Sequence, residues 1–444
     1  MKFKKQIALA LALAMALTAS AQDGINAPFS QYGFGLGHLP YNMPAAAAIG
    51  GAVITQSGNN IVNPFNPASY AAVEKESFVF DMGFGFDMVG LKDPSTTYRD
   101  GDGSLAYIAV AFPLTKWWKT SLSIMPMSDM NYSSTRIDSL PDVQGGAVRT
   151  IYTGNGGVNR LVWGHAFNVV PQRLSVGFNL NYYNGYLNRD MRYLFTAPDS
   201  VEQYANVIRQ KITFIKNFAL DFGLQYQQPL GKDYRLDLGL TLATPRPMQV
   251  TDNAMVRTFS VLQGTLFYHD TIFPGSGDST AYLSTMTMPT QLGLGLALQR
   301  NDHWRVALDA VYAPWSGVKY EDAHELFGAA TVAYDDNLRT HLGFQLLGDP
   351  NDSKYARRIT YSAGLHYECG KLRLQVPGSS DVHCLNEWGL GLGASLPMRK
   401  GRSLLTLSAA YSSMGSADLL RHNCFSLGLS VSSAESWFVK KKYN

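Results

Sequence analysis

From about residue 77 onward, hydrophobic and polar residues alternate with a period of two, which is typical of β-strands whose two faces meet different surroundings. Clear examples are the runs at 174–183, 220–227, 235–242, 291–299, 387–396 and 424–431. One face of each run is rich in large hydrophobic residues, whereas the other carries mostly Gly, Ser, Gln and isolated charges. The runs have about the ten residues that a tilted strand needs to cross a bilayer. This pattern favours a membrane barrel over the alternative, a large secreted β-sandwich.

The alternation predicts fourteen strands, starting near residues 77, 103, 118, 159, 172, 209, 233, 279, 303, 338, 357, 385, 402 and 422. The even-numbered connections are compact, at 113–116, 171–172, 229–233, 300–302, 349–356 and 398–401. The odd-numbered ones are mostly long, at 92–102, 135–158, 189–208, 251–278, 319–337, 370–384 and 415–421. Short periplasmic turns and long external loops are typical of outer-membrane barrels. We therefore predict an all-β fold, a transmembrane antiparallel β-barrel of about 14 strands over residues 77–438, closed by pairing of the first and last strands.

The N-terminal 21 residues have the three parts of a secretory signal peptide. Lys2, Lys4 and Lys5 precede an apolar stretch at 7–17, and Ala19-Ser20-Ala21 is an A-x-A cleavage site. The apolar stretch is too short to span a bilayer. We therefore expect export to the cell outer membrane of a Gram-negative cell, with the C-terminal tail 439–444 in the periplasm.

Residues 22–76 do not alternate and are rich in Gly, Ala and Asn. A structureless stretch of this length is unusual in a compact domain. Fourteen strands enclose a lumen too wide for side chains alone to fill. We therefore predict that residues 22–76 form a plug, or hatch, inside the barrel, next to inward-facing Gly and Ser residues.

Composition and motifs exclude several classes of function. Without the three N-terminal lysines, the 37 basic residues become 34, equal to the 34 acidic residues, so the chain lacks the basic surplus of a nucleic-acid binder. The glycines in Gly33-x-Gly35-x-Gly37 and Gly389-x-Gly391-x-Gly393 repeat every second residue and do not form a nucleotide-binding loop. No catalytic motif stands out. We predict a protein that is not an enzyme, with no cofactor and no bound metal.

The chain has three cysteines, and two of them bracket one connection between predicted strands. Cys369 and Cys384 are candidates for a disulfide at the base of that hairpin in an oxidising compartment. Cys424 would remain unpaired. The alternative, a zinc site formed by Cys369 with His383-Cys384 and His422-Asn423-Cys424, matches no standard ligand spacing.

Several short segments carry a family resemblance. They are Gly50-Gly51-Ala52, Asn63-Pro64-Phe65-Asn66-Pro67-Ala68, 288–295, 304–316 and 338–344. Together they resemble the FadL/TodX (OMPP1) outer-membrane transporters of long-chain fatty acids and other hydrophobic compounds. The segment 28–35 resembles a Bacteroidota-type branch of that family. The resemblance implies that Asn63, Pro64, Asn66 and Pro67 belong to the hatch motif.

The same resemblance implies a path for a hydrophobic ligand. Pro126 lies inside the predicted third strand, where proline removes a backbone donor. In the resembled family a kink in this strand opens the wall, so Pro126 is a candidate lateral gate into outer-membrane lipid; the alternative is a tolerated bulge. Candidates for ligand capture in an external loop are Leu262, Leu266, Phe267 and Phe273, and the alternative for this stretch is a simple extension of two strands.

The predicted function is passive uptake of hydrophobic small molecules through capture, hatch rearrangement and lateral exit. Two alternatives remain. The barrel could bind partner proteins through its extracellular loops as a subunit of a secretion or assembly complex. Its polar inner faces also suggest a porin for polar solutes, but the predicted plug opposes that function.

Overall fold

The computed structural model describes most of the chain between residues 24 and 436. The described ranges are 24–37, 40–93, 96–139, 146–196, 205–262, 265–272, 281–301, 303–318, 320–321, 333–370, 372–375, 382–398, 402–415 and 420–436. The expected signal peptide (1–21) and C-terminal tail (439–444) therefore lie outside the described residues.

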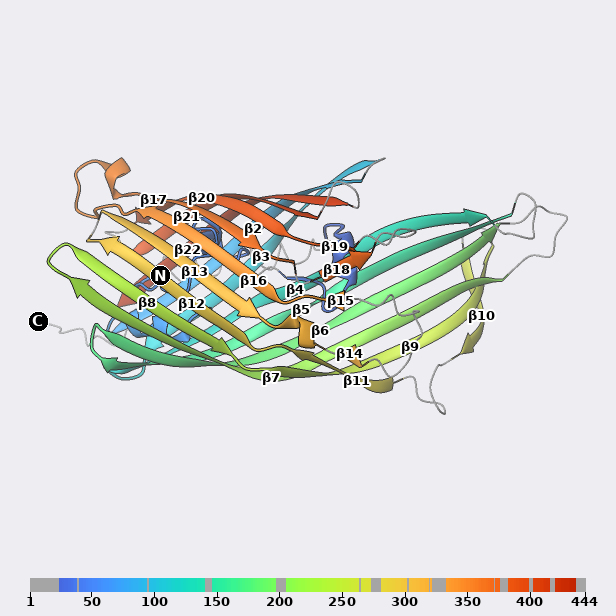
Figure 1. Ribbon diagram of the computed structural model, residues 1–444, viewed down its shortest axis with the longest axis horizontal. Helices are drawn as coiled ribbons and strands as arrows, with labels where there is room; N and C mark the ends of the chain where they lie inside the picture. The colour runs from blue at the N-terminus through green and yellow to red at the C-terminus, as the bar shows by residue number, and fades with distance from the viewer. Residues whose placement is uncertain are drawn as a thin grey trace, which may run out of the picture.

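Fourteen antiparallel strands form a closed, strongly tilted barrel (Figure 1). They are β2 (Ser77–Lys92), β3 (Thr97–Pro113), β4 (Trp118–Ser139), β5 (Ala147–Val170), β6 (Leu174–Thr196), β7 (Asn206–Leu230), β8 (Tyr234–Ala243), β12 (Gln291–Arg300), β13 (Trp304–Ala313), β16 (Asn337–Leu346), β17 (Thr360–Glu368), β20 (Glu387–Met398), β21 (Ser403–Gly415) and β22 (Arg421–Ser436). β2 pairs with β22 along its whole length, from Ser77–Ser436 to Lys92–Arg421. The predicted fold, strand number and closure between first and last strands are confirmed.

The two faces of the wall follow the alternation in the sequence. In β12, Leu292, Leu294 and Leu296 are exposed on the outside, whereas Gly293 and Gly295 are buried inside. Trp117 at one short turn is 56% exposed and stacks on Trp118 and Phe167. An apolar outer belt bordered by aromatic rings is what a bilayer requires of a barrel surface. Among the described residues, no helix is both long enough and apolar enough to cross a membrane.

Several predicted long connections are wrong, because strands continue where loops were expected. The predicted 92–102 connection is much shorter, because β2 ends at Lys92 and β3 already begins at Thr97. β4, β5, β6 and β7 likewise run through much of 135–158 and 189–208. Beyond the apolar belt a strand has no lipid-facing side, so its sequence loses the strict alternation that marked the membrane part.

The extended strands form a curved sheet that projects beyond the barrel, at the right of Figure 1. β9 (Arg246–Leu262) pairs with β7, and β10 (Thr265–Ile272) pairs with β9. β11 (Ala281–Met288) also pairs with β9. Smaller described elements are β14 (Tyr320–Glu321), β15 (Ala333–Tyr334), β18 (Leu372–Gln375), β19 (Val382–Cys384), η3 (Trp315–Gly317) and η4 (Tyr355–Arg358).

The N-terminal segment from residue 24 to residue 76 contains η1 (Pro28–Gln31), β1 (Leu36–Gly37), α2 (Pro44–Ala47) and η2 (Pro67–Ala72). Much of it packs against the inner wall, where inward-facing glycines allow close approach. A Cβ atom on Gly364 would lie 2.1 Å from the Gly50 nitrogen, and one on Gly391 would lie 1.9 Å from the Ala47 oxygen. The inner faces of β17 and β20 are therefore shaped to fit the backbone of this segment.

Replacing Gly364 with alanine should separate the hatch from the wall. The added methyl group meets hatch backbone, so we expect a loss of about 1–3 kcal/mol in the free energy of unfolding, the usual cost of overpacking. Denaturant unfolding in lipid vesicles measures this change. Gly85→Ala is the matched control, because Gly85 also faces the lumen and a Cβ there meets nothing within 4 Å. Equal stability of the two variants would contradict close packing of the hatch.

Candidate functional site

The Asn-Pro-Phe-Asn-Pro motif, residues 63–67, holds together the part of the hatch that includes Val53, Ile54 and Gln56. Asn63 Nδ2 donates to the carbonyl oxygens of Val53 (2.7 Å) and Gln56 (2.9 Å). Asn66 Nδ2 donates to Ile54 O (2.8 Å), and its Oδ1 accepts from the Ala68 amide at the start of η2 (3.1 Å). Asn63 and Asn66 are both buried, so their amides satisfy backbone groups that water does not reach. This arrangement gives the motif a structural role in the hatch.

The same part of the hatch is bonded to the barrel wall. The Ile54 amide donates to Asp309 Oδ2 of β13 (2.7 Å). Tyr70 Oη donates to Asn179 Oδ1 of β6 (3.1 Å), and Asn179 Nδ2 donates to Pro64 O (2.9 Å). These buried bonds make residues 50–72, which we call the hatch floor, a firmly anchored unit.

Next to the Asp309 anchor of the hatch floor, Tyr41 links the hatch to two barrel histidines, one of which, His341, pairs with Asp309. Its ring stacks on His366 with centroids 4.1 Å apart, and its hydroxyl lies 3.3 Å from His341 Nδ1. Burial raises the pKa of the Tyr41 phenol well above its ordinary value, so the hydroxyl stays protonated.

The wall is open between β3 and β4. These strands pair only from Ile108–Ile124 to Pro113–Lys119. Beyond Ile108 toward the start of β3, this strand keeps its pairing with β2. Beyond Ile124 toward the end of β4, that strand keeps its pairing with β5. The two strands therefore separate without losing their outer neighbours. Within the described residues, the upper part of β3 therefore has one free edge. The ladder ends at Ile124, seven residues along the chain from Trp117 at the short turn. For a strand tilted by about 40°, this corresponds to about 18 Å along the membrane normal. The opening therefore lies in the half of the apolar belt nearer the long connections.

Pro126 lies two residues beyond the end of the β3–β4 ladder. Pro126 pairs with Asn159 of β5 and Ser128 pairs with Val158, so Met127 is an extra residue in a β-bulge. Asn42 of the hatch spans the opening at this level, with its Nδ2 3.5 Å from Ala106 O of β3 and 3.4 Å from Pro126 O of β4. The proline and the bulge therefore mark the place where the strands part.

The hatch segment before Asn42 lies along the edge of β4 that faces the opening. Leu36 and Gly37 pair with Asp129 and Ser128 in an antiparallel register. The Ala27 amide donates to Asn131 O (2.7 Å). Hatch residues thus supply partners that β3 would supply in an unbroken wall.

A cavity of about 360 Å³ adjoins the opening. Leu105 and Ala106 of β3 and Pro126 of β4 line it on the wall side, while Tyr41 and Leu36 line it on the hatch side. The cavity therefore lies between the hatch and both strands that form the opening.

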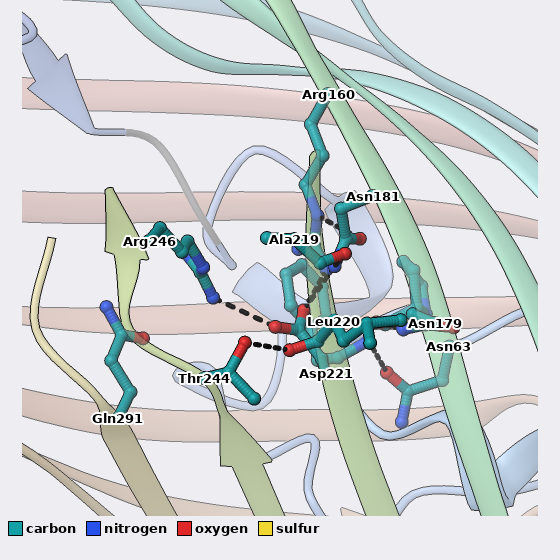
Figure 2. Close-up of polar contacts among 12 residues, drawn as sticks. Asn63, Arg160, Asn179, Asn181, Ala219, Leu220, Asp221, Thr244, Arg246 and Gln291 are labelled. Atoms are coloured by element: carbon teal, nitrogen blue, oxygen red, sulfur yellow. Dashed lines mark hydrogen bonds and ion pairs between the residues drawn. The ribbon is translucent and has the colours of Figure 1, made fainter. Parts of the chain in front are cut away.

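A second cavity of about 210 Å³ contains a buried charge cluster (Figure 2). Arg160 Nη2 and Arg246 Nη2 contact the two oxygens of Asp221, at 2.7 and 3.0 Å. Asn181 Nδ2 donates to the same carboxylate (2.9 Å). Two guanidinium groups therefore share one carboxylate, and within the described residues Arg246 Nε has no hydrogen-bond partner. Phe65 and Trp315 give the same cavity apolar walls, and Asp309 and Glu368 also line it.

The other residues predicted as sites are not brought together. Leu266 and Phe267 are exposed on β10 in the projecting sheet, and neither lines the cavities described above. Leu262 ends β9, and Phe273 lies outside the described residues. The strand-extension alternative therefore describes the backbone of this stretch.

The predicted disulfide between Cys369 and Cys384 is not formed, since both are free thiols, as is Cys424. Cys384 ends β19 opposite Arg373, and its Sγ lies 3.4 Å from Asp335 Oδ2. Cys369 follows β17, and its amide donates to Leu338 O of β16. The insertion of the β18–β19 hairpin gives the two thiols different partners.

The hatch partner of the opening and the charge cluster were not predicted from the sequence. The two-residue period of Gly33-x-Gly35-x-Gly37 is a signal for strand-like backbone in close contact with a neighbour, and Gly35 does approach Asp129 O. Asp221 was already placed on an inner face by alternation, and a charge on such a face indicates a partner in the lumen. No local signal identifies Arg160 and Arg246 as that partner.

Asn66→Ala should loosen the hatch floor. It removes the bond to Ile54 O and the cap of η2, and each loss costs about 0.5–2 kcal/mol. Amide exchange of residues 52–72, measured by mass spectrometry, should rise. Asn59→Ala is the control, because Asn59 is exposed and its bond is to Glu74 at the surface. Unchanged exchange in the Asn66 variant would contradict the structural role of the motif.

Comparisons with solved structures identify barrels of the same fold. A Pseudomonas aeruginosa FadL homologue matches with a TM-score of 0.59 and 14% identity, covering 89% of this chain and 98% of that chain. The Ralstonia pickettii toluene transporter TbuX matches with a TM-score of 0.56 and 15% identity, over 88% and 97%. The Pseudomonas putida toluene transporter TodX matches with a TM-score of 0.53 and 16% identity, over 89% and 98%. The predicted FadL/TodX-like architecture is confirmed.

No curated protein sequence matches the chain. A family model described as BamG matches residues 3–444. The chain, a transmembrane β-barrel of the FadL/TodX fold, therefore belongs to the BamG family.

Proposed function

We propose that the protein admits hydrophobic small molecules, such as long-chain fatty acids, through the outer membrane and releases them sideways between β3 and β4. The observation that carries this proposal is the cavity that reaches from the hatch to the parted strands, with Leu105, Ala106 and Pro126 on its wall side. In this proposal Pro126 is the lateral gate. The short turns face the periplasm, so the opening faces the outer leaflet.

The physical reason for a sideways route is the solvent preference of the ligand. Each CH₂ group moved out of water contributes about 0.8 kcal/mol, so a long acyl chain gains far more from lipid than from an aqueous lumen. The anchored hatch floor also opposes passage straight through the barrel. Transport of this kind is passive and needs no cofactor.

The charge cluster supports an amphiphile with an acidic head group. At Asp221 two guanidinium groups face one carboxylate, and within the described residues Arg246 Nε has no hydrogen-bond partner. A carboxylate accepts such charge-assisted bonds, while Phe65 and Trp315 offer apolar contact to a chain. External capture by Leu262, Leu266, Phe267 and Phe273 remains part of the proposal, supported by the exposure of Leu266 and Phe267.

Cross-linking the parted strands should stop uptake. We would replace the three cysteines with serine, introduce Ala106→Cys and Pro126→Cys, and join them with a short bifunctional thiol reagent. Because the ligand must pass between these residues, uptake of a labelled long-chain fatty acid by whole cells should fall to that of cells without the protein. Reduction of a cleavable linker should restore it.

The matched control is the pair Val110→Cys and Leu122→Cys, which faces across the intact part of the same ladder. Cross-linking there should leave uptake unchanged. If both cross-links or neither reduced uptake, the lateral route would be contradicted.

Arg246→Met should weaken binding of an anionic amphiphile about tenfold or more, because a charge-assisted hydrogen bond contributes about 1.5–3 kcal/mol. The Arg160–Asp221 pair remains, so the variant keeps a balanced buried charge. Calorimetry with laurate and with dodecanol separates the head group from the chain, and only laurate should bind more weakly. Arg357→Met, at an exposed site, is the control. An equal loss for both ligands would contradict head-group recognition.

A second candidate is a non-transport role as a partner-binding subunit of a secretion or assembly complex. The projecting sheet favours it, because Leu266, Phe267, Tyr268 and Ile272 are all at least 44% exposed on one short strand. Such a cluster of exposed apolar side chains is typical of a protein contact. Stoichiometric partners in preparations from native membranes, together with unchanged fatty-acid uptake in cells lacking the protein, would favour this candidate.

A further inference from the structure

The opening between β3 and β4 presents strand edges, and strand edges bind polypeptide. Within the described residues, the part of β3 that precedes Ile108 pairs only with β2. The part of β4 that follows Ile124 pairs with β5 and with two hatch residues. An acyl chain cannot hydrogen-bond to backbone N–H and C=O groups, so it leaves a strand edge without partners. Another backbone is the partner that satisfies a whole edge.

The chain already uses this edge in that way. Two stretches of the segment 26–37, which we call the strap, bind β4 in descending order along it. Asn26 exchanges hydrogen bonds with the Ser133 backbone through its side-chain amide (3.1 and 3.3 Å). Ala27 N donates to Asn131 O, and Ser30 Oγ accepts from Asn131 N (3.1 Å).

The second stretch of the strap is β1. Leu36 and Gly37 pair with Asp129 and Ser128, and Ser128 Oγ donates to Phe34 O (2.6 Å). Gly35 has φ +91°, and a Cβ there would lie 2.2 Å from Asp129 O. The edge thus accepts an extended segment that has a glycine at the point of closest approach.

Some strap contacts are more exposed than those of the hatch floor, although Ala27, Phe29, Ser30 and Phe34 are buried. Asn26 makes its Ser133 contacts in an exposed setting. The backbone N–H of Asn26 also donates to Asp100 Oδ2 of β3 (3.2 Å). Contacts with water on one side are easily exchanged for water, whereas the floor bonds at Asn63 and Asn66 are buried. A competing strand would therefore displace the strap and leave the floor in place.

We propose that the β4 edge over residues 128–133 is a strand-addition site, occupied at rest by the strap and taken in exchange by an extended, glycine-containing segment of a partner protein. The free edge of β3 lies across the same opening and offers the incoming segment a second ladder. This inference concerns the opening used in the proposed function, but it needs no passage of lipid through it.

The test uses the full mature chain in detergent and a fluorescent synthetic peptide with the sequence of residues 24–37. Two release variants weaken the strap: Gly35→Val, which introduces the clash with Asp129 O, and the milder Asn26→Ala/Ser30→Ala. We expect peptide binding to these variants at least tenfold tighter than to the unchanged chain, where the tethered strap competes at high effective concentration. A peptide carrying Gly35→Val should not bind.

A lock provides the control. Starting from the Asn26→Ala/Ser30→Ala variant without native cysteines, we would add Gly37→Cys and Ser128→Cys. These two positions are cross-strand neighbours, and Gly37 has room for a Cβ. Their disulfide should abolish peptide binding, and reduction should restore it.

Amide exchange at residues 128–133 completes the test. Unchanged exchange in both release variants would overturn the strap as the resident strand. Raised exchange without peptide binding, or equal binding to locked and released chains, would overturn strand addition. Because no lipid ligand is present, these outcomes are independent of fatty-acid uptake.

Discussion

Backbone hydrogen bonding in a medium without water is the constraint on which this structure depends. In hydrocarbon every N–H and C=O needs a partner within the protein, so a sheet must close on itself. β2 and β22 meet this requirement along sixteen residue pairs. β3 and β4 meet it over only six, from Ile108–Ile124 to Pro113–Lys119. The opening is therefore a departure from the rule that governs the rest of the wall, and such departures are expected at functional sites.

The hatch reconciles this opening with stability. Inward glycines such as Gly364 and Gly391 let hatch backbone approach the wall, and the floor is fixed by buried bonds from Asn63, Asn66 and Ile54. The preceding strap then reaches β4 and supplies partners there. One segment thus packs against the inner wall and covers part of the open edge of β4.

The sequence was informative wherever membrane and lumen impose opposite demands on neighbouring residues. Leu292 to Leu296 alternate with Gly293 and Gly295 because one face meets lipid and the other meets Ile54 of the hatch. That signal predicted the strands, their number and closure. It ended where the membrane ends, so the extensions of β4–β7 were taken for loops. Pro126 indicated an interruption in the wall. The hatch residues that pair with β4 there are distant in the sequence, so no local pattern predicts them. The thiols of Cys369 and Cys384 were wrongly paired for the same reason, because the β18–β19 insertion separates their surroundings.

The unequal anchoring of the hatch decides which motion is compatible with a sealed membrane. If the floor moved, the lumen would open along its axis and polar solutes would cross. The buried bonds of the floor to β6 and β13 oppose that motion. The strap makes its Asn26–Ser133 contacts in an exposed setting, and it lies beside the opening rather than across the axis. Displacement of the strap alone would widen the space between β3 and β4 and leave the axial path closed. Lateral release of a hydrophobic molecule and addition of a partner strand would then use the same movable element, and the two would compete for it.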